Sequence, residues 1–150
     1  MLRSILIVED NPRDIELSAI ALESYTLADK LDFVPDGNDA IRYLNDINIS
    51  KGKRKVVPKV VILDLLLPGA SGIEIMRTIR RNPAFGALPF VVFSASKNPI
   101  DISDAYEAGA NAYVIKPQDP SEYAQALQCI ADMFGALNQV PSPRVGTSLN

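Results

Sequence analysis

The sequence contains no histidine and only one cysteine, Cys129. Without histidine, serine–histidine and cysteine–histidine catalysis, most zinc sites and a role as phosphohistidine donor are excluded. A single cysteine excludes a disulfide framework and favours a reducing, cytoplasmic setting, and Cys129 fits a small hydrophobic residue on a helix. Any chemistry must therefore come from carboxylates, lysine, hydroxyl groups and a hard metal ion.

Long hydrophobic runs and an excess of one charge are also missing. No run of about 18 apolar residues is present to span a membrane, and no signal peptide is recognisable. The 15 Lys and Arg nearly balance the 18 Asp and Glu, so nothing marks the chain as a nucleic-acid or membrane binder. At 150 residues, we expect one domain with a full hydrophobic core.

Short apolar runs alternate with helical patterns along the whole chain. Strands are predicted at residues 4–8, 31–34, 60–63, 88–93 and 112–115. Helices are predicted near residues 12–25, 38–47, 71–82, 99–109 and 120–136. This alternation predicts an α/β fold of the (βα)₅ type, a doubly wound five-stranded parallel sheet with helices on both faces. Residues 1–136 are assigned to this domain, and 137–150, which lose the helical periodicity, to a flexible C-terminal tail.

Asp64 stands at the end of the most apolar of these strands. The segment 59–72 reads KVVILDLLLPGASG, so that the apolar run stops at Asp64 and a Leu-Pro-Gly turn follows. A carboxylate inside a buried strand is costly unless it is paired. The carboxyl end of a parallel strand, in contrast, borders the ligand crevice of an open α/β sheet. We therefore predict that Asp64 is the reactive group.

Other reactive side chains follow three more strands. Glu9 and Asp10 follow the first strand, Ser94 the fourth and Lys116 the fifth. The carboxyl ends of parallel strands lie at one edge of the sheet, so we expect these residues to converge on Asp64. Each of these residues also has an ordinary structural explanation. Glu9 and Asp10 could be acids near a helix N-terminus, Ser94 a turn residue and Lys116 a solvated charge. Their occurrence together favours a functional site.

The composition of this predicted site favours phosphoryl transfer. Crowded carboxylates repel one another unless a cation joins them, and Mg²⁺ is the cation that suits oxygen ligands. Asp64 is predicted to attack in line, while Mg²⁺ and Lys116 neutralise the equatorial oxygens and Ser94 donates to one of them. Asp10 is predicted to hold the metal directly, and Glu9 directly or through a water.

The chain resembles the receiver domains of response regulators in bacterial two-component signalling, over residues 2–135. The matching motifs are ILIVED at 5–10, LDLLLPGASG at 63–72, FSAS at 93–96 and GANAYVIKP at 109–117. The resemblance implies a flavodoxin-like sheet with strand order 2-1-3-4-5. It also implies Mg²⁺-dependent phosphorylation by a sensor histidine kinase, and a signalling protein rather than an ordinary enzyme.

The resemblance also implies roles for individual residues. The acidic pair of the family corresponds to Glu9 and Asp10, and its phospho-acceptor to Asp64. Its switch hydroxyl corresponds to Ser94, its switch aromatic to Tyr113 and its lysine to Lys116. The main-chain carbonyl of Leu66 is implied as a further metal ligand, and the Lys116–Pro117 bond as cis. Taken by itself, Tyr113 could equally be a surface aromatic.

A finer resemblance is to single-domain regulators that work with phytochrome-type histidine kinases. It is carried by NPRDIELS at 11–18, RRNPAFGALP at 80–89 and the long loop before the third strand. The implied partner is a sensor kinase such as a bacteriophytochrome. The last helix is apolar over a wide arc, and most of these residues are expected to pack in the core. Because the arc is wider than one buried side needs, we also expect a homodimer through the face formed by residues 99–109, 112–115 and 120–136.

Several alternatives stay open at this point. A degenerate receiver or scaffold would share the fold without being phosphorylated. An aspartate-nucleophile phosphatase generally needs a second acid where this chain has Leu66. Neither glycine-rich nucleotide motif occurs, and residues 137–150 are too few for a helix-turn-helix module. The basic residues among 51–55 fit a solvated insertion better than a contact for an acidic partner.

Overall fold

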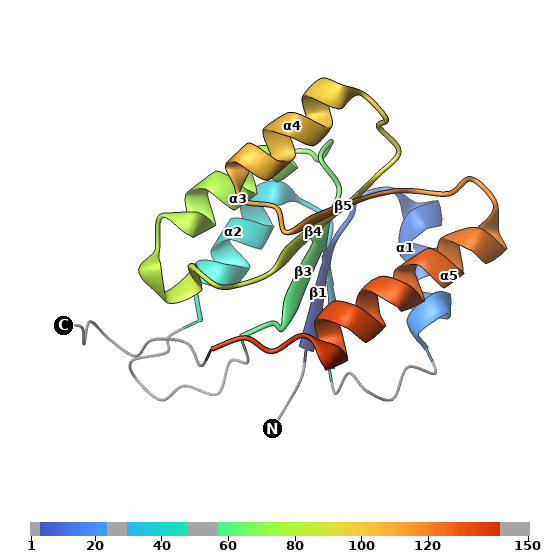
Figure 1. Ribbon diagram of the computed structural model, residues 1–150, viewed down its shortest axis with the longest axis horizontal. Helices are drawn as coiled ribbons and strands as arrows, with labels where there is room; N and C mark the ends of the chain where they lie inside the picture. The colour runs from blue at the N-terminus through green and yellow to red at the C-terminus, as the bar shows by residue number, and fades with distance from the viewer. Residues whose placement is uncertain (1–3, 24–29, 48–56, 142–150) are drawn as a thin grey trace.

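Five parallel strands form one sheet in the order β2-β1-β3-β4-β5 (Figure 1). The computed structural model describes residues 4–23, 30–47 and 57–141. The strands are β1 (Ser4–Val8), β2 (Lys30–Val34), β3 (Val60–Leu63), β4 (Phe90–Ser94) and β5 (Ala112–Ile115). The predicted fold class and the strand order implied by the resemblance are both confirmed.

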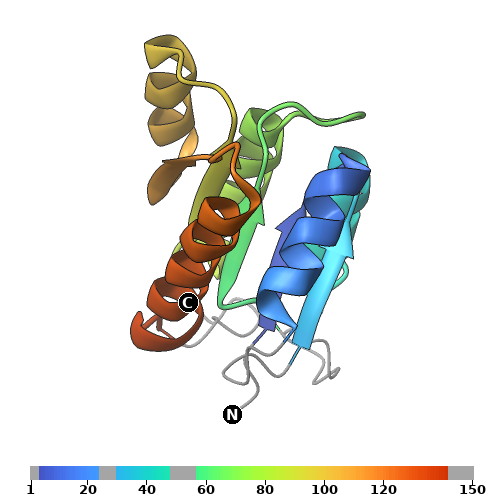
Figure 2. The ribbon, with the colours of Figure 1, turned by 90° about the vertical axis from the view of Figure 1, so that its right-hand side faces the viewer.

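The helices lie on both faces of the sheet, with α1 and α5 on one face and α2, α3 and α4 on the other (Figure 2). Their bounds are α1 (Pro12–Leu22), α2 (Gly37–Asn45), α3 (Gly72–Arg80), α4 (Pro99–Ala108) and α5 (Pro120–Ile130). The described residues also form two short elements, the 3-10 helix η2 (Pro83–Phe85) and the π-helix η3 (Ala131–Leu137). No helix in these ranges is both long and apolar enough to cross a bilayer.

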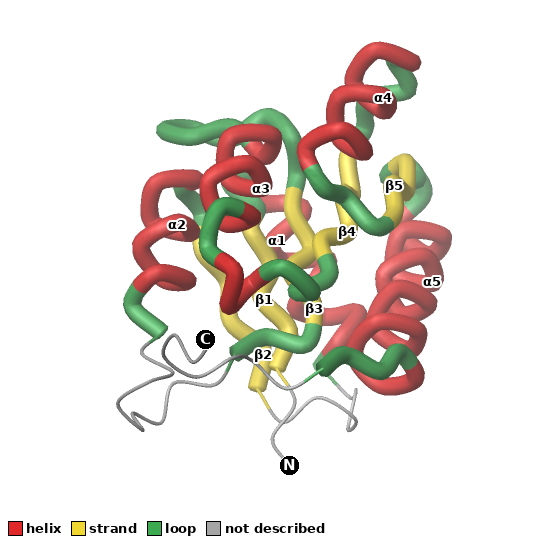
Figure 3. Tube along the Cα trace, turned by 60° about the vertical axis from the view of Figure 1, so that its left-hand side comes forward, coloured by secondary structure: helices red, strands yellow, loops and turns green. Residues whose placement is uncertain are grey.

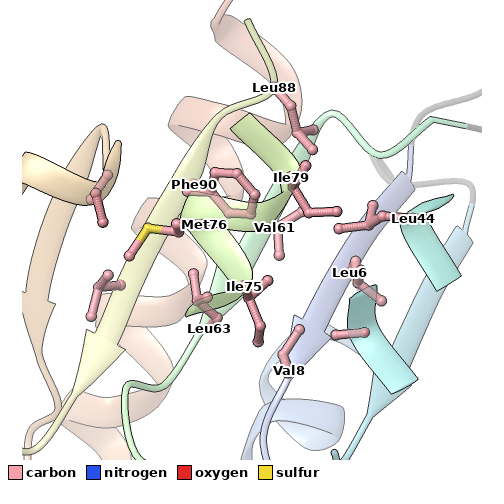
Figure 4. Packing of buried hydrophobic residues seen from close by; sticks show 14 of the residues in the cluster. Leu6, Val8, Leu44, Val61, Leu63, Ile75, Met76, Ile79, Leu88 and Phe90 are labelled. Atoms are coloured by element: carbon pink, nitrogen blue, oxygen red, sulfur yellow. The ribbon is translucent and has the colours of Figure 1, made fainter. Parts of the chain in front are cut away.

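The sheet separates two hydrophobic clusters because successive side chains of a strand point to opposite faces. Leu6 and Val8 of β1 pack in the cluster beneath α2 and α3, part of which is drawn in Figure 4. Ile5 and Ile7 pack in the cluster beneath α1 and α5. Every residue of β1, β3 and β4 is buried. Both faces are thus covered, as the continuous apolar runs predicted.

Polar residues in the connections set where the helices begin. Each α-helix follows an N-cap side chain that accepts a backbone N–H, and these caps are Asn11, Asp36, Ser71, Asn98 and Asp119. The helix α4 ends, as predicted, at Gly109, whose φ of 117° is a left-handed conformation that glycine tolerates. These caps therefore fix the first turn of each of the five helices.

The last helix differs from the prediction for 120–136. It is α-helical only to Ile130 and continues as the π-helix η3. Gly135 comes close to β1 there, because a Cβ on this residue would lie 3.2 Å from Ile5 Cδ1. The apolar spacing along the sequence does not distinguish i+4 from i+5 hydrogen bonding, so the pattern could not reveal this change.

Three smaller expectations also need correction. Helix α1 ends at Leu22 rather than near residue 25. Strand β4 starts at Phe90, two residues later than predicted, since Pro89 has no N–H to donate to the ladder. The Lys116–Pro117 bond is trans, the isomer that X-Pro bonds favour by about 0.5–1 kcal/mol. The basic segment 51–55 and residues 142–150 lie outside the described residues.

Candidate functional site

The carboxyl ends of β1, β3 and β5 bring three of the predicted site residues together. Glu9, Asp64 and Lys116 directly follow these strands, and each is fixed by a backbone bond to a neighbouring strand. The donors and acceptors are Glu9 N to Val34 O at 3.1 Å, Asp64 N to Val8 O at 3.2 Å, and Lys116 N to Ser94 O at 2.8 Å. The sheet ladder therefore extends one residue beyond each strand and fixes where the three side chains start.

Lys116 is the centre of the site. Its Nζ donates to Glu9 Oε1 at 2.5 Å, to Asp14 Oδ2 at 2.8 Å and to Asp64 Oδ2 at 2.8 Å. An ammonium group has three N–H donors, so each donor has one carboxylate partner. The Lys116 side chain is 7% exposed, and those of the three acids are between 5% and 15% exposed. These are partly desolvated ion pairs rather than surface pairs.

Burial and charge act in opposite directions on this cluster. Burial by itself lowers the pKa of Lys116, but the hydrogen bonds that its ammonium donates to Asp14, Asp64 and Glu9 outweigh this effect and leave the pKa raised. Burial raises the pKa of Glu9 above its ordinary value, and Lys116 offsets this only in part. Three carboxylates share one ammonium, so the cluster keeps a formal charge of −2. That excess of negative charge suits a divalent cation.

The donor set fits Mg²⁺ in chemistry. Within the described ranges, no three His, Cys, Asp or Glu side chains are grouped to hold a metal by themselves. Mg²⁺ commonly binds through one or two carboxylates and keeps several waters, so such a group is not required. The carboxylate oxygens of Glu9 and Asp64 belong to the class of ligand that it prefers.

Backbone groups orient the Asp64 carboxylate from the other side. Its Oδ1 accepts the N–H of Leu65 at 2.7 Å and that of Leu66 at 3.4 Å. Gly72 packs directly against the same residue, because a Cβ on Gly72 would lie 2.5 Å from the Asp64 carbonyl oxygen. Gly72 thus allows α3 to begin beside Asp64. The Leu66 side chain is 80% exposed.

Ser94 and Tyr113 meet in the loop between β4 and α4. Ser94 is buried, and its Oγ accepts the N–H of Ser96 at 3.3 Å. The Tyr113 hydroxyl donates to the carbonyl oxygen of the same residue, Ser96, at 2.9 Å. The Ser96 hydroxyl in turn donates to Asp101 in the first turn of α4, at 2.5 Å. Both residues that the resemblance assigns to a switch therefore contact one loop residue.

The structure differs from the expected acidic group at two positions. Asp10 is exposed, and in the described parts of the chain no hydrogen bond or ion pair joins its carboxylate to the cluster. Asp14, which the sequence analysis did not single out, occupies the third carboxylate position. The available signal was a polar residue on the inner face of α1, where Ser18 and Leu22 follow at four-residue intervals.

A buried polar network ties Asp14 to α5. The Tyr123 hydroxyl donates to the Asp14 carbonyl oxygen at 3.3 Å and lies 3.0 Å from Ser18 Oγ. Burial raises the pKa of Tyr123 to about 12, so the hydroxyl stays protonated. Its ring also packs against Phe93, with centroids 5.0 Å apart. The helix α1 is thereby held at a fixed position beside the site.

Comparison with known protein sequences gives the same family throughout. The model of the response regulator receiver domain family matches residues 5–128. The chain is 31% identical over 139 residues to the "Probable methanogenesis regulatory protein FilR2" of Methanothrix harundinacea, covering 93% of this chain and 88% of that protein. It is 30% identical over 130 residues to the response regulator Rcp1 of Synechocystis, covering 87% of each. It also matches DNA-binding regulators, but spans only about half of their length, 47% in one case.

Solved structures agree with the sequence relatives. The phosphorylated cyanobacterial phytochrome response regulator RcpA has a TM-score of 0.83 and 31% identity, covering 95% of this chain and all of that one. The Mn²⁺-bound form of Rcp1 has a TM-score of 0.82 and 28% identity, covering 93% of this chain and 99% of that one. Because the family model matches most of its length, this chain belongs to the response regulator receiver domain family.

Proposed function

We propose that this protein accepts a phosphoryl group from a sensor histidine kinase on Asp64 and signals through contacts with other proteins. The observation that carries the proposal is the Lys116 Nζ placed 2.8 Å from Asp64 Oδ2 at the carboxyl edge of the sheet. In the transfer, an Asp64 oxygen forms a bond to phosphorus as the P–N bond of the phosphohistidine breaks. The imidazole keeps the electron pair of that bond. On this proposal the protein is a signalling component rather than an ordinary enzyme.

We propose that Asp10, Asp64 and the Leu66 carbonyl hold Mg²⁺, and that Glu9 does so directly or through a water. The excess negative charge around Lys116 supports this, as does the Mn²⁺-bound form of Rcp1. When bound, Mg²⁺ supplies positive charge beside the phosphoryl oxygens. Lys116 donates to those oxygens as well, and the backbone N–H of Leu65 keeps the carboxylate oriented.

The proposed switch uses Ser94 and Tyr113. A phosphoryl group on Asp64 offers new acceptor oxygens, and the Ser94 hydroxyl donates to one of them. Ser94 then exchanges its bond with the Ser96 N–H, and the loop that also holds the Tyr113 hydroxyl moves with it. Because Ser96 is bonded to Asp101, the change reaches α4.

Incubation with phosphoramidate and Mg²⁺, followed by intact mass, tests the acceptor. The expected result is one phosphoryl group on the wild type, none on Asp64→Asn, and one on the control Asp104→Asn at an exposed position of α4. Phosphate release without an adduct would instead favour the phosphatase alternative. No reaction at all would identify a degenerate receiver.

A phytochrome-type histidine kinase is the proposed partner. The support is the likeness to RcpA and Rcp1, which runs over nearly the whole of those chains. Phosphotransfer from a purified bacteriophytochrome kinase should label the wild type within the first minutes and leave Asp64→Asn unlabelled. Equal labelling by an unrelated histidine kinase at the same concentration would contradict this choice of partner.

A homodimer through α4, β5 and α5 is proposed as the output form. These three elements lie together at one end of the sheet (Figure 3). Ile100, Tyr106 and Ile115 expose apolar surface on them. The same elements carry acidic but no basic residues. A symmetric contact would bring like charges together, so we expect the dimer to strengthen as salt screens them. Sedimentation velocity at low and high salt, with and without phosphoramidate, tests this, and a monomer in all four conditions would contradict it.

A further inference from the structure

Of the three carboxylates that contact Lys116 in the described part of the chain, Asp14 is the one that does not come from the end of a strand. It belongs to the first turn of α1, and its side chain is 13% exposed. Two bonds fix its backbone, since its N–H donates to Asn11 Oδ1 at 3.2 Å and its carbonyl oxygen accepts the Tyr123 hydroxyl at 3.3 Å. Asp14 therefore joins the site through helices α1 and α5, independently of the sheet edge.

The three carboxylates that accept from the Lys116 ammonium have different roles in the proposed function, on which this inference rests. Glu9 and Asp64 must turn toward the metal and the phosphoryl group, and both are then poorer partners for Lys116. Asp14 binds neither the metal nor the phosphoryl group in this proposal. A lysine side chain with several rotatable bonds loses its position when its partners leave, unless one of them stays.

We propose that Asp14 is a positioning residue that keeps the Lys116 ammonium beside Asp64 while Glu9 and Asp64 engage the metal and the phosphoryl group. One N–H of Lys116 stays on Asp14 Oδ2, and the other two are free to follow the phosphoryl oxygens. The Asp14 carbonyl oxygen accepts the buried Tyr123 hydroxyl, which Ser18 Oγ contacts at 3.0 Å, and these contacts hold Asp14 in place. Asp14 itself touches neither the phosphoryl group nor the acceptor carboxylate.

The variant Asp14→Asn tests the proposal, with Glu16→Gln as its matched control. Both remove one negative charge from α1, but Glu16 is exposed and does not contact Lys116. We expect the phosphorylation rate at saturating phosphoramidate to fall about tenfold or more in Asp14→Asn, the loss expected for a charge-assisted hydrogen bond. The half-saturating donor concentration should change less than about twofold, because donor binding itself is untouched. Glu16→Gln should match the wild type in both values.

A second measurement does not depend on phosphorylation. Carbon-13 relaxation of Lys116 Cε in the Mg²⁺-containing protein reports how tightly the side chain is held. We expect clearly greater mobility in Asp14→Asn than in the wild type or Glu16→Gln, and partial recovery of both rate and rigidity in Asp14→Glu. Neutralising Asp14 should not unfold the protein, because Glu9 and Asp64 still pair Lys116 and the cluster loses excess negative charge. Asp14→Ala provides a second variant with the same expected loss.

The outcomes separate this proposal from the proposed function. An unphosphorylated wild type would overturn the proposed function, whereas the mobility of Lys116 would still decide the role of Asp14. Wild-type mobility and rate in both Asp14→Asn and Asp14→Ala would overturn the positioning role. A lower rate with unchanged Lys116 mobility would overturn it as well, since the loss would then come from charge alone.

Discussion

Replacing Lys116 by methionine should reveal how much of the stability depends on the charge cluster. Methionine has a similar length and volume, so the substitution removes the ammonium and leaves packing nearly unchanged. Glu9, Asp14 and Asp64, none of whose side chains is more than 15% exposed, would then face one another without a cation. Removing one partner of a buried ion pair costs about 3–5 kcal/mol. With total stabilities of about 5–15 kcal/mol, this is a large fraction.

The loss should depend on pH in a defined direction. Burial raises the folded-state pKa of Glu9 above its unfolded value and Lys116 offsets part of this shift, so removing Lys116 raises the pKa of Glu9 further. Such a group contributes stability below the unfolded pKa and loses it as the pH rises through the folded pKa. The variant should therefore be closest to the wild type near about pH 5 and furthest from it near about pH 7.5. In the wild type, stability should also fall as the pH rises, but by less, because burial raises the pKa of Glu9.

Urea unfolding at these two pH values, with and without Mg²⁺, measures the effect. At an m value of about 2 kcal/mol/M, a loss of about 4 kcal/mol lowers the midpoint by about 2 M at the higher pH. Mg²⁺ should restore part of the loss by neutralising the acids. Lys97→Met, at an exposed position in the loop before α4, should behave as the wild type. A loss below about 1 kcal/mol, or an equal loss at both pH values, would contradict a role of Lys116 in neutralising the three acids.

Three further predictions concern contacts that support the site and the fold. Gly72→Ala should slow phosphorylation and cost about 1–3 kcal/mol in urea unfolding, because the new Cβ would lie 2.5 Å from the Asp64 carbonyl oxygen. Gly86→Ala, with its nearest atom at 3.5 Å, should have little effect on either measurement. Tyr123→Phe should lower the free energy of unfolding by about 1–2 kcal/mol, since Ser18 loses its buried partner, and an unchanged urea midpoint would contradict this. Arg80→Ala should cost about 2–4 kcal/mol by the same assay, because Arg80 donates to several carbonyl oxygens, including those of Leu88 and Gly109, whereas the exposed Arg77→Ala should not.

The fold class and most of the candidate site can be predicted from the order of residues alone. Continuous apolar runs require strands buried on both faces, and alternation with helices requires parallel connections. Once the strands are parallel, their carboxyl ends lie at one edge, whatever their order. Glu9, Asp64 and Lys116 could therefore be grouped without coordinates, because each directly follows a strand. The order 2-1-3-4-5 came from the resemblance to a family, since short apolar strands do not specify their neighbours.

The acids that surround Lys116 are set by packing in the folded protein. The rotation of α1 against β1 and α5 sets which face of this helix meets the site, and that rotation depends on packing such as the Ser18–Tyr123 contact. As a result Asp14 pairs with the lysine while Asp10, one residue after Glu9, is exposed. The π-helical end of α5 has the same origin, because it depends on how closely Gly135 approaches Ile5. Residues that follow a strand directly are placed by the sheet ladder, whereas a residue one helical turn later is placed by side-chain packing, which a single sequence does not specify.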